Sequence, residues 1–136
     1  MQRMEEKILA EGKVLPGGVL KVGSFLNQQI DTAFLREMGE EIARLFAGSG
    51  VTKVLTIESS GIAIAAAAAM ELGVPMVFAK KHKTSNVDGS VYSTEVHSFT
   101  HGTDYTVVVS RDYLLPGERV LLVDDFLANG AALRGL

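Results

Sequence analysis

The chain has 136 residues and a mass of 14.5 kDa, the size of one domain. Apolar residues make up 47% and charged residues 21%, so the composition supports a packed core and excludes a disordered chain. The 13 basic and 16 acidic side chains argue against partners such as nucleic acid or a membrane surface. The lack of cysteine excludes disulfides, thiolate metal sites and cysteine nucleophiles.

The first part of the chain contains two helical patterns separated by a turn. Residues 1–10 have the apolar spacing of a short amphipathic helix. Residues 14–30 show no regular period, and Pro16–Gly18 has the composition of a turn. Asp31 is a residue type that caps helices, and the apolar spacing behind it predicts a helix that Gly48 ends.

Strands and helices alternate in the rest of the chain. Uninterrupted apolar runs predict strands at 51–57, 74–79, 106–110 and 119–123. Such runs are typical of strands that are buried on both faces of a parallel sheet. A helix is predicted at 61–72, between the first two strands. We therefore expect an α/β fold, a parallel sheet flanked by helices.

Residues 80–105 interrupt this alternation. The segment is polar, and its middle has the alternating pattern of an exposed hairpin strand. Its length favours either a flexible lid or a solvated β-excursion. It holds all three histidines of the chain, whose spacing is not typical of a metal site.

The last eight residues, 129–136, form only the beginning of a helix. Isolated helices shorter than about 12–15 residues are marginal in water. We therefore expect residues 1–136 to be a single domain that is truncated at its C-terminus.

The strongest chemical signal is an acidic pair, Asp124 and Asp125, at the end of a predicted buried strand. Ligands bind at this edge of open α/β sheets. A loop of small residues follows and opens a helix, whose free N–H groups can bind a phosphate. The loop consists of Ala128, Asn129, Gly130, Ala131 and Ala132. The pattern indicates a sugar-phosphate site, or alternatively a plain strand end followed by a helix cap.

Two further clusters follow predicted strands. The first is a turn made of Glu58, Ser59, Ser60 and Gly61. Its consecutive N–H groups can bind an anion, although a plain turn with a serine cap has the same sequence. The second cluster, Lys80 and Lys81 with Lys83, comes directly after a strand and either neutralises a diphosphate or forms a solvated face.

These motifs resemble those of the type I phosphoribosyltransferases. Their phosphoribosyl-pyrophosphate motif is also an apolar run, an acidic pair and a small-residue loop, although the loop here lacks the usual threonines. DDFLANG resembles the xanthine phosphoribosyltransferase branch, as do VLKVGSFLNQQID, TIESSGIA and VPMVFAKKHK. The resemblance covers essentially the whole chain in order.

The resemblance implies a type I phosphoribosyltransferase fold with a β-hairpin hood at 80–105. It implies a purine-salvage enzyme that converts phosphoribosyl pyrophosphate and xanthine to xanthosine 5′-monophosphate and pyrophosphate. Mg²⁺ would be bound through phosphoribosyl pyrophosphate, with no metal site on the protein, and the enzyme would be a cytoplasmic homodimer. The alternatives are guanine or hypoxanthine as the base, a regulator that binds phosphoribosyl pyrophosphate without turnover, and an inactive fragment.

The resemblance also assigns residues to parts of the substrates. Asp124 and Asp125 would hold the ribose, and residues 128–132 the 5′-phosphate. Residues 58–61, in a turn that often contains a non-proline cis peptide in this family, would bind pyrophosphate together with Lys80 and Lys81.

The same resemblance places the purine pocket at three other residues. Leu20 and Asn27 would line it, and Phe126 is a further candidate. By residue type alone, Leu20 and Phe126 also fit a hydrophobic core, and Asn27 also fits a turn.

Overall fold

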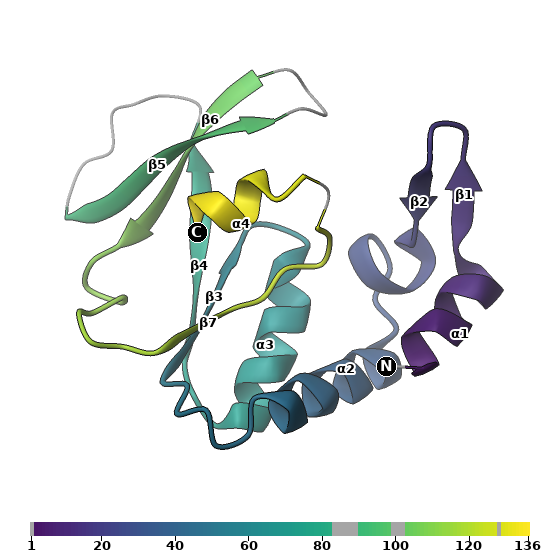
Figure 1. Ribbon diagram of the computed structural model, residues 1–136, viewed down its shortest axis with the longest axis horizontal. Helices are drawn as coiled ribbons and strands as arrows, with labels where there is room; N and C mark the ends of the chain where they lie inside the picture. Colours follow the sequence, from purple (N-terminus) through teal and green to yellow (C-terminus); the bar gives the residue numbers. More distant parts are fainter. Residues whose placement is uncertain (1, 83–89, 99–102, 128) are drawn as a thin grey trace.

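The computed structural model describes residues 2–82, 90–98, 103–127 and 129–136 and is drawn in Figure 1. In chain order the elements are α1 (Gln2–Glu11), β1 (Lys13–Leu15), β2 (Val19–Lys21), the π-helical turn η1 (Gly23–Asn27), α2 (Thr32–Leu45), β3 (Lys53–Ile57), α3 (Gly61–Leu72), β4 (Met76–His82), β5 (Val91–Ser98), β6 (Thr103–Ser110), β7 (Val120–Leu122) and α4 (Ala131–Gly135). In this described part of the chain, no helix combines the length and the apolar character that a membrane crossing requires.

The start of α2 confirms the predicted cap. The Asp31 carboxylate accepts a hydrogen bond from the Phe34 N–H at 3.1 Å. Lys7 of α1 donates to the other Asp31 oxygen at 2.6 Å. These two bonds hold the pKa of Asp31 below its ordinary value, and they join α1 to the first turn of α2.

Residues 14–30 are more regular than the sequence predicts. β1 and β2 form an antiparallel hairpin, and η1 follows it directly. The predicted turn is confirmed, since Gly17 and Gly18 have φ angles of 87° and 77° that favour glycine. The expectation of irregular structure was wrong because strands of three residues are too short to show a period.

The main sheet is mixed and has the order β5-β6-β4-β3-β7 (Figure 1). β3 is parallel to both β4 and β7, which confirms the parallel part. β6 runs antiparallel to β4, and β5 runs antiparallel to β6. The hairpin predicted as an excursion therefore continues the main sheet.

Pairing with β6 also lengthens β4 beyond its predicted end. Lys80 lies opposite Val108, and Lys81 lies opposite Val107. The two lysines are therefore part of a strand, and the prediction that they follow one was wrong. Their polar side chains hid the strand because the apolar run ends at Ala79. The lid role of residues 80–105 stays a prediction, and residues 83–89 and 99–102 lie outside the described part.

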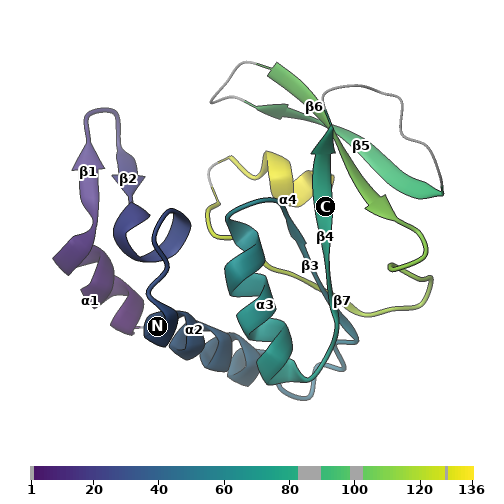
Figure 2. The same cartoon turned by 180° about the vertical axis from the view of Figure 1, so that it is seen from behind.

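Each face of the sheet has its own buried cluster. On one face α2 and α3 pack against β3 and β7, together with Val22, Phe25 and Leu26 from the N-terminal segment. On the other face α4 packs over Leu55, Val96 and Val107. Helix α4 is drawn in front of the sheet in Figure 1 and behind β4 in Figure 2, while α3 stands toward the viewer in Figure 2. The loop that carries the acidic pair joins β7 to α4 between these two layers.

Candidate functional site

The acidic pair lies at the carboxyl end of β7, as predicted. The Val123 N–H donates to the Leu55 carbonyl at 3.0 Å, so Asp124 is the first residue beyond the ladder between β7 and β3. Asp124 is half-buried, and its Oδ1 accepts the Asp125 N–H at 2.9 Å. Burial raises the pKa of Asp124, and the Asp125 carboxylate adds to the rise, while the Asp125 N–H and the Lys81 charge oppose it.

The first residue of α3 packs directly against this carboxylate. A Cβ built on Gly61 would lie 2.7 Å from Asp124 Oδ1, and it would lie closer still to Thr56 Oγ1. Thr56 is fully buried, and its hydroxyl has no hydrogen-bond partner among the residues that the structure describes. Only glycine at position 61 leaves room for both oxygens.

The turn between β3 and α3 is hydrogen-bonded to β4. The Glu58 N–H donates to the Ala79 carbonyl at 2.9 Å, and Glu58 Oε1 accepts the Lys81 N–H at 2.6 Å. The Glu58–Ser59 peptide is cis. Ser60 occupies the N-cap position of α3, as the alternative of a serine cap expects, but its side chain makes no capping hydrogen bond. The first N–H groups of α3 are therefore not capped by the Ser60 side chain.

Lys80 and Lys81 point to opposite faces of β4 because side chains alternate along a strand. Lys81 shares its face with Val107 and α4. Its Nζ lies 5.3 Å from the centroid of the Tyr105 ring. Burial, and secondly the Asp124 charge, raises the pKa of Tyr105. Lys81, Tyr105 and Asp124 thus influence one another electrostatically.

A cleft of about 230 Å³ lies between Asp124 and α4. Its walls are formed by Asp124, Phe126, Leu127 and the loop residues from Asn129 to Leu133. Gly130 has a φ of 78° and turns the chain into α4. Asn129 Oδ1 accepts the Ala131 N–H at 3.0 Å. The structure therefore brings Asp124 and four of the five predicted loop residues together around one cleft. The fifth loop residue, Ala128, lies outside the described residues, as do Lys83 and His101.

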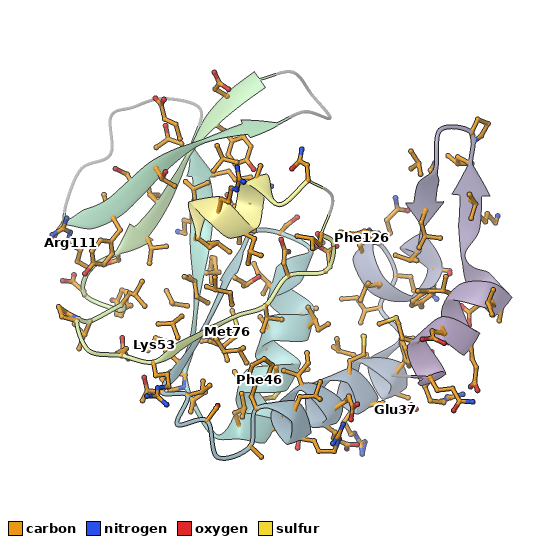
Figure 3. The ribbon with its side chains drawn as sticks, in the orientation of Figure 1. Glu37, Phe46, Lys53, Met76, Arg111 and Phe126 are labelled. Atoms are coloured by element: carbon orange, nitrogen blue, oxygen red, sulfur yellow. The ribbon has the colours of Figure 1, made fainter. Side chains whose placement is uncertain are left out.

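Of the predicted base-binding residues, Phe126 lines this cleft, whereas Leu20 and Asn27 lie on β2 and η1. Leu20 of β2 is half-buried against the cluster that contains Val123. Asn27 is exposed at the end of η1. Phe126 is 41% exposed, so its assignment to the core is wrong, and Figure 3 shows it beside the loop on the side of the N-terminal segment.

Thr56 and Tyr105 lie beside the predicted site residues Gly61 and Lys81, and the sequence analysis singles out neither of them. Thr56 is a single hydroxyl within an apolar strand, a pattern that marks a buried polar group. Tyr105 alternates with Val107 and Val109 on one face of β6, although in the sequence it stands at the end of the polar segment 80–105. Across the described ranges, no three histidine, cysteine or carboxylate side chains gather to hold a metal ion. The carboxylate oxygens of the acidic pair are ligands of the kind that magnesium prefers.

Residues 23–136 match the phosphoribosyl transferase domain. The whole chain is 51% identical to a xanthine phosphoribosyltransferase from Lachnoclostridium phytofermentans, over 70% of that protein, and 54% identical to one from Bifidobacterium longum, over 71%. A crystal structure of adenine phosphoribosyltransferase from Giardia lamblia with 9-deazaadenine matches 94% of the chain and 71% of that protein, with a TM-score of 0.74 and 26% identity.

Proposed function

Because the chain belongs to the phosphoribosyl transferase domain family, we propose that it is a purine-salvage enzyme that transfers phosphoribose to xanthine. The substrates are phosphoribosyl pyrophosphate and xanthine, and the products are xanthosine 5′-monophosphate and pyrophosphate. One observation carries the proposal. A half-buried carboxylate, Asp124, lines the same cleft as a glycine-containing loop that leads into a helix. The chain that carries this arrangement is 51% identical in sequence to a xanthine phosphoribosyltransferase.

In this proposal the cleft holds the ribose 5-phosphate part of the substrate. The carboxylates of Asp124 and Asp125 accept hydrogen bonds from the ribose hydroxyls. The backbone N–H groups of residues 128–132 bind the 5′-phosphate, where Gly130 and the alanines allow close approach. The phosphate accepts a hydrogen bond from the Ala131 N–H and displaces the Asn129 side chain, whose Oδ1 accepts that bond in the structure.

The diphosphate lies across the ends of β3 and β4. It is bound by the N–H groups of the turn from Ser59 to Gly61 and by the Lys81 ammonium. Glu58 has a different part in this proposal from the one the resemblance implies, because its carboxylate accepts the Lys81 N–H and keeps the turn in place. Lys80 projects from the other face of β4 and contributes its charge from a greater distance.

The reaction joins a xanthine nitrogen to the anomeric carbon, while the bond from that carbon to the diphosphate oxygen breaks. The transition state resembles an oxocarbenium ion, and the proton that the nitrogen loses as the new bond forms passes to the leaving diphosphate. The residues named above position the two substrates and stabilise the leaving diphosphate. Asp124 and Asp125 balance the positive charge that develops on the ribose. Magnesium, bound with the diphosphate, supplies further neutralisation of its charge.

Leu20, Asn27 and Phe126 form the purine pocket in this proposal. The side chains of Leu20 and Phe126 pack on the two faces of the flat base, and the Asn27 amide forms hydrogen bonds with the edge of the base. Val22, Phe25 and Leu26 support this arrangement, because they pack in the same cluster as Val123, the residue before Asp124.

Three finer points belong to the same proposal. Residues 80–105 close over the bound substrates and exclude water. The enzyme is a homodimer, a proposal that the exposed apolar side chains of Val14 and Val19 on the β1–β2 hairpin support, since they are 75% and 52% exposed. It works in the cytoplasm, in keeping with the lack of cysteine.

The test is product chromatography of the purified chain with magnesium, phosphoribosyl pyrophosphate and equal amounts of xanthine, guanine and hypoxanthine. We expect xanthosine 5′-monophosphate to predominate. Asp124→Asn should lower its rate at least about 100-fold, whereas Asp112→Asn, a matched change outside the cleft, should not alter it. A predominant guanosine or inosine product would overturn the choice of base. No nucleotide at all, despite tight binding of phosphoribosyl pyrophosphate, would point to a binding protein instead.

A further inference from the structure

Lys81 and Tyr105 form a pair on the face of the sheet that α4 covers. Lys81 lies opposite Val107 in the β4–β6 ladder, and Tyr105 is two residues from Val107, so both side chains project from the same face. The Lys81 Nζ lies 5.3 Å from the Tyr105 ring centroid, within the range of a cation–π interaction. The ring packs against the buried cluster that contains Val96 and Val107, and Tyr105 lies opposite Val96 of β5.

The chemistry of this pair differs from that of an ion pair. A carboxylate partner would occupy the ammonium N–H groups and neutralise their charge. The face of an aromatic ring attracts the cation but leaves its N–H donors available to another group. In the part of the chain that the structure describes, Lys81 Nζ makes no salt bridge within 4.0 Å. Its positive charge nevertheless acts to lower the pKa of the half-buried Asp124.

We propose that Tyr105 is a positioning residue, whose ring holds the Lys81 ammonium at the end of β4, where it binds the diphosphate of phosphoribosyl pyrophosphate. This inference rests on the proposed function. A lysine side chain has four flexible bonds, and fixing them costs entropy when a ligand binds. A ring that orders the ammonium beforehand lowers this cost and so increases affinity for the diphosphate.

The chain contains a second pair of the same kind that serves as a matched control. Arg111 lies 4.6 Å from the Tyr92 ring centroid, and its Nε donates to the Val91 carbonyl at 3.1 Å. Figure 3 shows Arg111 at the other side of the molecule from Phe126, which lines the Asp124 cleft. Removing the Tyr92 ring therefore tests the general cost of losing such a pair without touching the site.

The experiment measures pyrophosphate affinity by titration calorimetry with magnesium, and KM values for both substrates by product chromatography. We expect Tyr105→Leu to raise the Kd for pyrophosphate and the KM for phosphoribosyl pyrophosphate about two- to fivefold, with the KM for xanthine unchanged. Tyr105→Phe keeps the ring and should match the wild type, as should Tyr92→Leu. Lys81→Met alone should weaken pyrophosphate binding, and adding Tyr105→Leu to it should cause no further loss.

Each contrary result has a distinct meaning. Wild-type affinity in Tyr105→Leu overturns the inference, as does an additional loss in the double variant or a Tyr105→Phe variant that is as weak as Tyr105→Leu. Should Tyr105→Leu fail to fold, Tyr105→Met takes its place, and an unchanged Kd in Lys81→Met overturns the inference without any change to the ring. A wild-type chain that neither binds pyrophosphate nor makes nucleotide overturns the proposed function, and the inference falls with it.

Discussion

Replacing Gly61 with alanine adds one methyl group where α3 meets the strand end and the acidic pair. Gly61 does not have a positive φ, so alanine fits the backbone at this position. The methyl carbon would, however, lie 2.7 Å from Asp124 Oδ1 and would also overlap Thr56 Oγ1. Since Thr56 is fully buried within β3, the carboxylate and the start of α3 must take up most of the movement.

The expected magnitudes follow from these distances. Ordinary contact begins at about 3.4 Å, so the separation of the methyl carbon and Asp124 Oδ1 must grow by about 0.7 Å. Overpacking of this kind costs about 1–3 kcal/mol, and the higher helix propensity of alanine offsets up to about 1 kcal/mol. A net loss of about 1–2 kcal/mol lowers the Tm of a 136-residue chain by about 3–7 °C. A shift of this size at a substrate-positioning group should lower kcat/KM by about 10- to 100-fold.

Gly39→Ala is the matched control for this prediction. Its added Cβ would lie 2.8 Å from the carbonyl carbon of Ala67, in the contact between α2 and α3. We expect a similar decrease in Tm with kcat/KM within about threefold of the wild type, measured by thermal melting and product chromatography. If Gly61→Ala loses no more activity than Gly39→Ala, the position of the Asp124 carboxylate does not govern the reaction and the reasoning is refuted.

Three further predictions concern the same site. Glu58→Ala removes the acceptor of the Lys81 N–H and should raise the KM for phosphoribosyl pyrophosphate about 3- to 10-fold in steady-state kinetics, while Glu58→Gln, which keeps an acceptor, should stay near the wild type. Gly130→Ala puts a side chain at a φ of 78°, at a cost of about 1–2 kcal/mol, and should raise the same KM about 5- to 30-fold; an unchanged KM would show that the loop relaxes freely. Because burial raises the pKa of Asp124, its stabilising contribution is complete below the ordinary pKa of about 3.9 and is lost as the pH rises through the higher folded value. Asp124→Asn should therefore melt a few degrees above the wild type at about pH 7, with a difference that shrinks toward about pH 4; a difference that does not depend on pH would contradict the raised pKa.

Local patterns were sufficient for several of the helices and strands. The cap at Asp31, the α3 helix and the apolar runs of β3 and β7 each depend on residues within one or two turns or one strand. The placement of Asp124 at a strand end follows from the same short pattern. For this reason the parallel part of the sheet and the position of the acidic pair at the end of β7 could both be predicted.

The hairpin and the lysine cluster depend on pairing between distant segments. Lys81 joins β4 only because Val107 lies opposite it, and the short β1–β2 hairpin has too few residues for a visible period. Strand pairing of this kind satisfies backbone groups without requiring apolar side chains, so polar residues continue the strand. A prediction that relies on the apolar run therefore places the end of the strand too early in the sequence.

The sequence by itself determined which residue types stand at the ends of the strands, and with them the family and the class of substrate. Only the tertiary structure decided which of these residues face one another. It turned Lys80 and Lys81 to opposite faces of β4, set Tyr105 beside Lys81, and brought Thr56 against Gly61. The physical reason is that side-chain proximity across a sheet follows strand order and register, which are properties of the packed chain as a whole.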